Sequence, residues 1–364
     1  MKRHKYFNIC NSMSSTLAAS AQSALFKIPR EVRDEILSFV LLSRYPVPQT
    51  PEEIEEQERQ VPVALREHYR EGLYYICDET AYTSNALSLL LTNKQLHAET
   101  RDALERLDIP FELDIKFVND RYLAPTWTSI PTKTQHFKHL RTVFQSIGEW
   151  QKPPQESKFS MIDIWSTGCG GPPGYVWIFY DTLVHFLKYG PAPPESTGSP
   201  QLFSVECLEL DFVDPEDVGL LPSPESRRHL WALRSRHNAG QEPKVLRPEW
   251  LAEDLRDQLM SLFGMDYYTA EYGRILHGRI GRVVFKANGQ MVHEIDVGQV
   301  LAGLKFEDSF GNYQREHRAE TWIQWKEQAQ ELRKRRGLHT VEFSKGWQKE
   351  ARDWAAEYYA SKRR

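Results

Sequence analysis

The chain has 364 residues, of which 40% are hydrophobic and 26% are charged. These are the values of a globular protein with a sizeable core, and they exclude a chain that is disordered throughout. The formal net charge of −4 gives no electrostatic reason to expect nucleic acid as a partner. The longest apolar run, Tyr175 to Leu187, is interrupted by Asp181 and His185, so the sequence predicts no membrane-spanning segment and no membrane partner.

The four cysteines, Cys10, Cys77, Cys169 and Cys207, lie far apart and form no C-x-x-C pair. This spacing excludes the usual zinc and redox motifs. Scattered thiols in a long chain are typical of a reduced compartment, so we expect a cytoplasmic or nuclear protein. The basic cluster from Arg333 to Arg336 fits a nuclear localisation signal. The alternative is that these cations lie near a helix C-terminus and offset the helix dipole.

Residues 1–24 carry Lys2, Arg3, Lys5 and several serines, without any acidic side chain. The composition predicts a disordered tail, and a targeting segment is the alternative. Further along, residues 43–85 begin with three prolines and an acidic run, Glu52 to Glu56, which predict a solvated surface segment. A helix is expected within it, over Val63 to Tyr75.

The first apolar stretch of the chain runs from Leu25 to Leu42. Pro29 fits the first position of a helix, where its missing N–H costs nothing. Glu31 then lies near the positive end of the helix dipole. Helical spacing produces one apolar stripe, which consists of Val32, Ile36, Phe39 and Val40 and is widened by Leu37 and Leu41.

The second apolar stretch, Ala86 to Thr100, contains a run of leucines followed by Thr92 and Gln95. Their T-x-x-Q spacing is that of a capping box. It predicts a short helix that ends near Leu91 and a second helix that begins at Asn93. The inner face of the second helix is expected to comprise Leu96, Thr100, Ala103, Leu104 and Leu107.

Together the two stretches resemble a known module. Phe26 to Val32, followed by Ile36-Leu37, resembles the leucine-proline-x-glutamate-isoleucine opening of an F-box. Leu89 to Glu99 resembles the closing half found in the F-box-like family of filamentous fungi. The resemblance covers residues 25–108, with Ile28 in place of the usual leucine and an insertion at 43–85 that is longer than the ordinary turn.

The resemblance implies a helical module that docks on the Skp-type adaptor of a cullin–RING ubiquitin ligase. The residues that would carry this docking are Ile28, Pro29, Ile36, Leu37, Val40 and Leu41. The alternative is that the same side chains form a core beneath the following domain.

After Asp108 the pattern changes to alternating apolar and polar residues, which predicts strands over Ile109–Ile115, Leu140–Ile147 and Leu202–Phe212. Tyr175 to Tyr189 is apolar on most sides and predicts a buried helix. A further helix begins at Pro248. Its inner face is expected to comprise Leu251, Leu255, Leu259 and Leu262, with Gly264 at its end.

Asn288-Gly289 separates two strand-like runs, Arg282–Ala287 and Gln290–Ile295, and is the strongest short signal for a β-hairpin. Residues 109–310 are therefore expected to form a mixed α/β domain, followed by C-terminal helices over 311–364. In the last helix one face must pack on the body or on a partner, and we expect the body. That face consists of Trp347, Ala351, Trp354, Ala355 and Tyr358.

Motifs for catalysis are incomplete throughout the chain. The glycine-rich loop from Gly168 to Gly174 lacks the Lys and Ser/Thr of a phosphate-binding loop. His97-Ala98-Glu99 resembles the H-x-E of zinc deaminases but no P-C-x-x-C follows. A basic loop between Leu221 and Pro248 is read as solvated; it contains Arg227, Arg228, Arg234 and Arg236. The sequence thus predicts no catalytic residue, no cofactor and no metal.

The combined expectation is an α+β protein whose F-box-like helical module precedes a mixed α/β sheet domain with C-terminal helices. Its expected function is that of a non-enzymatic interaction protein, which brings an unknown protein substrate to a ubiquitin ligase and raises its local concentration there. A scaffold protein whose F-box-like helices are only a core subdomain is the first alternative. An enzyme of unrecognised type is the second.

Overall fold

The computed structural model describes residues 24–55, 84–119, 122–132, 134–148, 164–165, 172–191, 201–225, 245–265, 270–306 and 318–362. Four of the sequence expectations lie wholly or mostly outside these residues. They concern the N-terminal tail, the helix within the insertion, the glycine-rich loop and the arginine-rich loop.

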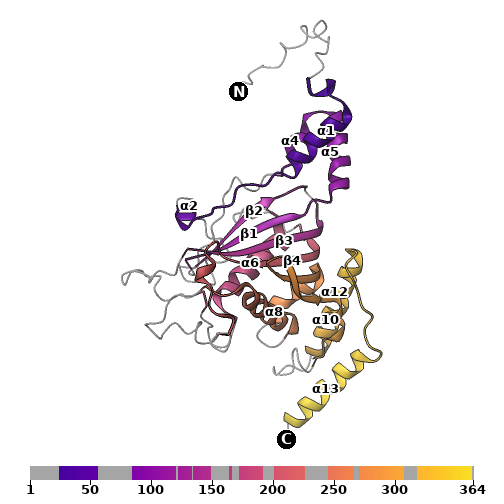
Figure 1. The fold of residues 1–364 in the computed structure, drawn as a ribbon. Coiled ribbons are helices and arrows are strands. Elements are labelled where there is room, and N and C mark those ends of the chain that lie inside the picture. Colours follow the sequence, from indigo (N-terminus) through magenta and orange to yellow (C-terminus); the bar gives the residue numbers. More distant parts are fainter. Residues whose placement is uncertain are drawn as a thin grey trace, which may run out of the picture.

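A mixed six-stranded sheet forms the centre of the molecule (Figure 1). Its order is β2-β1-β3-β4-β5-β6, with β1, β3, β4 and β5 parallel and an antiparallel strand at each edge. The expected mixed α/β sheet is therefore confirmed, and the chain as a whole is a mixed α/β protein and not the α+β protein that the sequence predicted. The strands are β1 (Phe111–Val118), β2 (Tyr122–Ser129), β3 (His136–Ile147), β4 (Ser204–Val213), β5 (Ile280–Ala287) and β6 (Gln290–Asp296).

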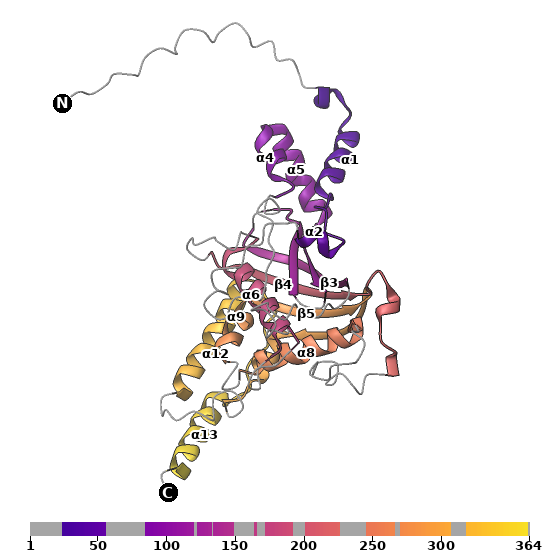
Figure 2. The same ribbon diagram turned by 90° about the vertical axis from the view of Figure 1, so that its left-hand side faces the viewer.

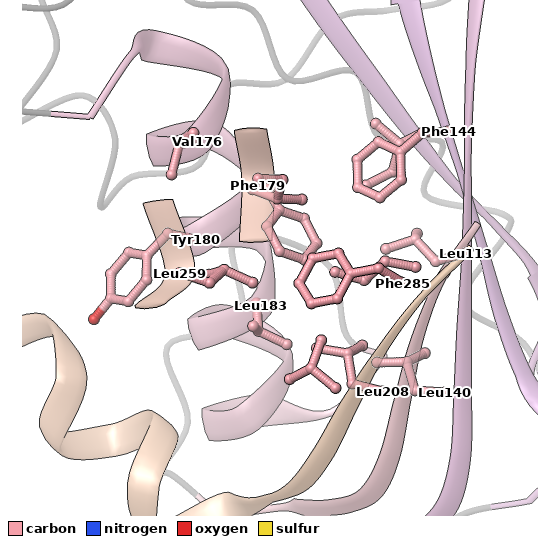
Figure 3. Packing of buried hydrophobic residues seen from close by; sticks show 14 of the residues in the cluster. Leu113, Leu140, Phe144, Val176, Phe179, Tyr180, Leu183, Leu208, Leu259 and Phe285 are labelled. Atoms are coloured by element: carbon pink, nitrogen blue, oxygen red, sulfur yellow. The ribbon is translucent and has the colours of Figure 1, made fainter. Parts of the chain in front are cut away.

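Helices cover one face of this sheet (Figure 2). They are α6 (Gly174–Tyr189), between β3 and β4, and α8 (Pro248–Gly264) and α9 (Ala270–Arg279), between β4 and β5. Figure 3 shows the side chains that fill the interface, among them Leu113, Phe144 and Phe285 from the strands. Phe144 stacks on Phe212 with ring centroids 4.6 Å apart. This layer of aromatic and aliphatic side chains is the main core.

The helix expected over Tyr175–Tyr189 is confirmed by α6. Most of its side chains are buried, because it lies against the sheet, α8 and α9. Among the helices of the ranges given above, none is both long and apolar enough to cross a membrane.

The opposite face of the sheet carries charges, as the period-two alternation of the strands requires. Arg141 on β3 lies opposite Glu209 on β4, with Nε and Oε1 3.3 Å apart. Lys286 on β5 approaches the other oxygen of Glu209 to 2.7 Å. A short helix, α2 (Pro51–Glu55), packs on this face through Ile54. The sheet is therefore covered by helices on one side and by paired charges on the other.

The β-hairpin expected at Asn288-Gly289 is confirmed by β5 and β6. Both turn residues have positive φ, 51° and 78°, which glycine and asparagine tolerate at low cost. The sequence did not predict β2, which contains Pro125. A proline lacks the N–H that pairs strands, and β2 tolerates it because it is an edge strand of the sheet.

The C-terminal region consists of α10 (Val297–Gly303), α12 (Arg318–Arg335) and α13 (Trp347–Lys362), at the opposite end of the molecule from α1 (Figure 1). The inner face of α13 packs on α12, as expected. Ala351 and Ala355 are buried, and Trp347 meets Trp322 edge-to-face at 5.7 Å. These contacts make a second, smaller core.

Lys326 of α12 lies at the centre of that second core. Its ammonium group lies 4.7 to 5.1 Å from the ring centroids of Trp322, Phe343 and Trp347. It also donates hydrogen bonds to the carbonyls of Ala302 (3.1 Å) and Leu304 (2.7 Å) at the end of α10. Burial lowers the pKa of Lys326 to about 8. One cation therefore connects three separate segments of the chain.

His277 of α9 is fully buried next to α12. Its Nε2 lies 2.8 Å from the carbonyl oxygen of Phe263, so Nε2 carries the proton and donates it. The other ring nitrogen, Nδ1, has no hydrogen-bond partner among the described residues. Burial, together with the positive charges of Arg333 and Lys326, lowers the pKa of His277 to about 4. The imidazole is therefore neutral in the folded protein at neutral pH.

We expect the stability of the fold to fall as the pH is lowered from 6.5 to 4. The unfolded histidine, with its ordinary pKa of 6.5, binds a proton in this range that the folded one does not. The difference corresponds to about 3 kcal/mol in the free energy of unfolding. Urea denaturation at both pH values measures it. His277→Gln should lose about 3 kcal/mol less than wild type over this range; an equal loss would contradict the assignment.

Candidate functional site

Three helices form a group that extends away from the sheet (Figure 1). They are α1 (Arg30–Leu41), α4 (Leu87–Thr92) and α5 (Lys94–Leu107), preceded by a short 3-10 turn, η1 (Ala24–Lys27). Both α1 and α4 pack on α5. We call α1, α4 and α5 the N-terminal helix group.

The helix group has a core of its own. Leu37 and Leu41 of α1 are buried against α5, where Leu96 and Ala103 face them. This small cluster is separate from the main core of the sheet. The helices therefore hold one another through apolar contacts that do not involve the helices of the sheet.

A buried ion pair joins α1 to α5. The guanidinium of Arg33 donates to both carboxylate oxygens of Glu99, at 3.0 and 2.6 Å, and to the carbonyl of Ile28 at 2.5 Å. Gln95 also donates to Glu99, at 3.0 Å. The hydrogen bonds from Arg33 lower the pKa of Glu99 to about 2. A bidentate pair of this kind fixes orientation as well as distance, so it sets the angle at which α1 lies on α5.

The remaining charges along the contact between α1 and α5 are also paired. Arg30 bonds Asp34 within α1 (3.0 Å) and Asp102 on α5 (3.2 Å). Arg106 of α5 approaches Asp34 to 3.6 Å. These pairs are more exposed than Arg33–Glu99 and therefore contribute less to stability, but they leave these charges paired along the contact between α1 and α5.

The opposite side of α1 is apolar and exposed. Val32 is 43% exposed, Ile36 is 40% and Phe39 is 80%. Spaced at i, i+4 and i+7, these three residues form one stripe along the helix, which we call the outer face of α1. Leu91 at the end of α4 is also exposed, at 75%. Eleven large apolar side chains of the described residues are exposed. Five of them belong to this region: the three of the outer face, Leu91, and Leu42, which directly follows α1.

The structure divides the six residues that the resemblance assigns to adaptor docking. Pro29 and Ile36 are exposed, Ile28 and Val40 are half-buried, and Leu37 and Leu41 are buried. The sequence could not distinguish the two sides of α1, because apolar residues occur on more than half of its circumference. Two charged residues could have indicated the inner side. Arg33 lies four residues before Leu37 on α1, and Glu99 lies on the inner face of α5.

The start of α5 differs from the expected capping box. The N-cap is Asn93, whose side-chain oxygen accepts the backbone N–H of Leu96 at 2.9 Å. The hydroxyl of Thr92 instead donates to the carbonyl of Ser88 within α4 (2.7 Å). Gln95 is directed to Glu99. The expected break between the two helices is confirmed, but the capping residue is Asn93 and not Thr92.

We therefore expect Asn93→Ala to lower the free energy of unfolding of the helix group by about 1 kcal/mol, because the N–H of Leu96 loses its partner. Thr92→Ala, the control, should change it by less than about 0.5 kcal/mol. Native-state hydrogen exchange of the α5 amides measures both. A larger effect of Thr92→Ala than of Asn93→Ala would indicate that Thr92 is the capping residue, as the capping box predicts.

Both ends of the insertion bind the helix group to the edge strand β2 and to the residue that follows it. The backbone N–H of Tyr45 donates to the carbonyl of Thr128 (2.9 Å), and that of Asn85 donates to the carbonyl of Ile130 (3.1 Å). Arg44 pairs with Glu112 of β1. These bonds fix the helix group on the sheet from one side, while α5 leads directly into β1.

The charged face of the sheet is a second candidate region. Asp114 is buried there, which raises its pKa, and Lys116 lies 3.3 Å away. Lys116 also donates to Gln145 at 2.6 Å. Within the described ranges, no three or more His, Cys, Asp or Glu side chains are placed to hold a metal ion. The charges of this face mostly pair with one another, whereas the outer face of α1 is left exposed by the residues that the structure describes.

No protein-family model, curated protein or solved structure matches this chain.

Proposed function

We propose that the N-terminal helix group docks on the Skp-type adaptor of a cullin–RING ubiquitin ligase, and that the chain is a non-enzymatic substrate receptor. The F-box-like resemblance of residues 25–108 motivates the adaptor. The observation that carries the proposal is the exposure of Val32, Ile36 and Phe39 along one side of α1.

The position of this stripe supports docking because the fold does not need it. Leu37, Leu41 and the Arg33–Glu99 pair already hold α1 on α5. Contiguous exposed apolar surface on a protein usually marks a contact with another molecule. An amphipathic helix that presents residues at i, i+4 and i+7 is a common way to enter an apolar groove.

In this proposal the chain performs no chemistry. The adaptor connects it to the ligase, and the remainder of the chain presents a surface to a protein substrate. Ubiquitin transfer is carried out by other subunits, and the chain acts by raising the local concentration of the substrate at the ligase.

The burial of Leu37 and Leu41 favours a second candidate, a scaffold protein in which the F-box-like helices form only a core subdomain. This alternative expected Ile36 and Val40 to be buried as well. Ile36 is instead exposed, at 40%, and Val40 is half-buried. The two functions differ in one respect that can be measured, since the scaffold binds no Skp-type adaptor.

Calorimetric titration of the full chain with a purified Skp-type adaptor tests the proposal. Wild type should bind, and Ile36→Asp should weaken binding by more than about tenfold while the chain stays folded. Met260→Asp is the matched control, because Met260 is also 40% exposed but belongs to α8, in the helical layer of the sheet. It should bind like wild type. Absence of binding by the wild-type chain would contradict the proposal.

A further inference from the structure

The outer face of α1 carries one large aromatic ring, that of Phe39. Phe39 is the most exposed large apolar side chain of the described residues, at 80%. It stands on a helix whose other side is fixed by Leu37 and Leu41. A large aromatic ring on a rigid backbone loses little conformational entropy on binding, which is why such residues often dominate the energy of an interface.

Two carboxylates on α1 lack the pairing found elsewhere in the helix group. Glu31 and Glu35 are exposed, and neither forms an ion pair or side-chain hydrogen bond with a described residue. Glu31 lies in the first turn, where the helix dipole stabilises a negative charge. Glu35 is in the middle of the helix and has no such role. It precedes Phe39 by four residues, so the two side chains are neighbours on the helix surface.

We infer that the partner surface which receives the outer face of α1 has a pocket for Phe39 and basic side chains beside it that pair with Glu35. The inference rests on the proposed function and adds the chemistry of the contact. An unpaired carboxylate next to an anchor ring is complementary to a cation at the rim of the pocket. Charges at a rim act mainly on the rate of association and on its salt dependence.

Association kinetics between the full chain and a purified Skp-type adaptor, measured at low and high salt, test the inference. Phe39→Ala should weaken binding by more than about tenfold, chiefly through faster dissociation. Glu35→Gln should slow association by about threefold at low salt and reduce its salt dependence. Glu105→Gln is the control, because Glu105 is an exposed carboxylate of the same helix group that lies near the end of α5, where Arg101 approaches it to 3.8 Å. It should associate like wild type.

The outcomes separate the inference from the proposed function. If wild type binds and Ile36→Asp does not, while Phe39→Ala and Glu35→Gln behave like wild type, docking stands and the inference is wrong. Faster association of Glu35→Gln would show an acidic rim and would also overturn it. If wild type binds no adaptor, the proposed function and the inference are both wrong.

Discussion

Substitution of Leu37 by alanine is expected to lower the free energy of unfolding of the helix group by about 3 kcal/mol. Leu37 is only 3% exposed and packs in the small core between α1 and α5. Removing three side-chain carbons there loses apolar burial and leaves a cavity, and both effects destabilise the fold. Hydrogen exchange of the α1 and α5 amides measures the change locally, without assuming that the whole chain unfolds together.

Ile36 provides the control, because it is the adjacent residue but faces outward. Ile36→Ala should cost less than about 1 kcal/mol, since the side chain is 40% exposed in the free protein. Equal losses for the two variants would mean that the outer face of α1 is covered within the chain. That result would favour the scaffold function. A large difference would show that substitutions on the outer face can be interpreted as effects on binding.

Substitution of Arg333 by methionine should be at least as damaging, at about 3 kcal/mol or more. The side chain is fully buried, and burial lowers the pKa of its guanidinium to about 10. Its partners are all carbonyl oxygens, so methionine fills much of the space but leaves them without a donor. The bonds run to His277 (2.7 Å), Ile280 (2.6 Å), Gly281 (3.3 Å) and His339 (2.9 and 2.7 Å).

Arg336, three residues further on, is the matched control because it donates to one carbonyl, that of Leu202, at 2.9 Å. Arg336→Met should cost about 1 kcal/mol. Urea denaturation followed by tryptophan fluorescence reports on both variants, since Trp322 and Trp325 belong to the same helix as Arg333. If Arg333→Met were as stable as wild type, relief from burying a cation would outweigh the lost hydrogen bonds.

Local patterns in the sequence predicted the elements whose formation depends on near neighbours. The Asn288-Gly289 hairpin, the helix α6 and the helix that begins at Pro248 follow from turn chemistry and periodicity alone. The end of that helix was less well predicted. Gly264 is still helical, and Met265 adopts the left-handed conformation that ends it.

Contacts between distant residues were beyond such patterns. Arg33 and Glu99 are 66 residues apart, and nothing in either neighbourhood specifies the other. The same holds for Lys326, whose partners include Ala302 and Trp347. For the candidate site, the sequence predicted which helix carries the apolar stripe. It could not show that Leu37 faces inward and Ile36 outward, because this depends on which side of α1 packs on α5.

The order of the strands has a consequence for synthesis of the chain on the ribosome. Each parallel strand after β1 pairs with one already made, β3 with β1, β4 with β3 and β5 with β4. The last strand, β6, then adds to β5 through a two-residue turn. Once β2 has paired with one edge of β1, every later strand of the sheet adds to the opposite edge, so from β3 onward the sheet can grow in one direction as the nascent chain emerges. The slow, non-local steps of parallel pairing are thereby spread over the time of translation.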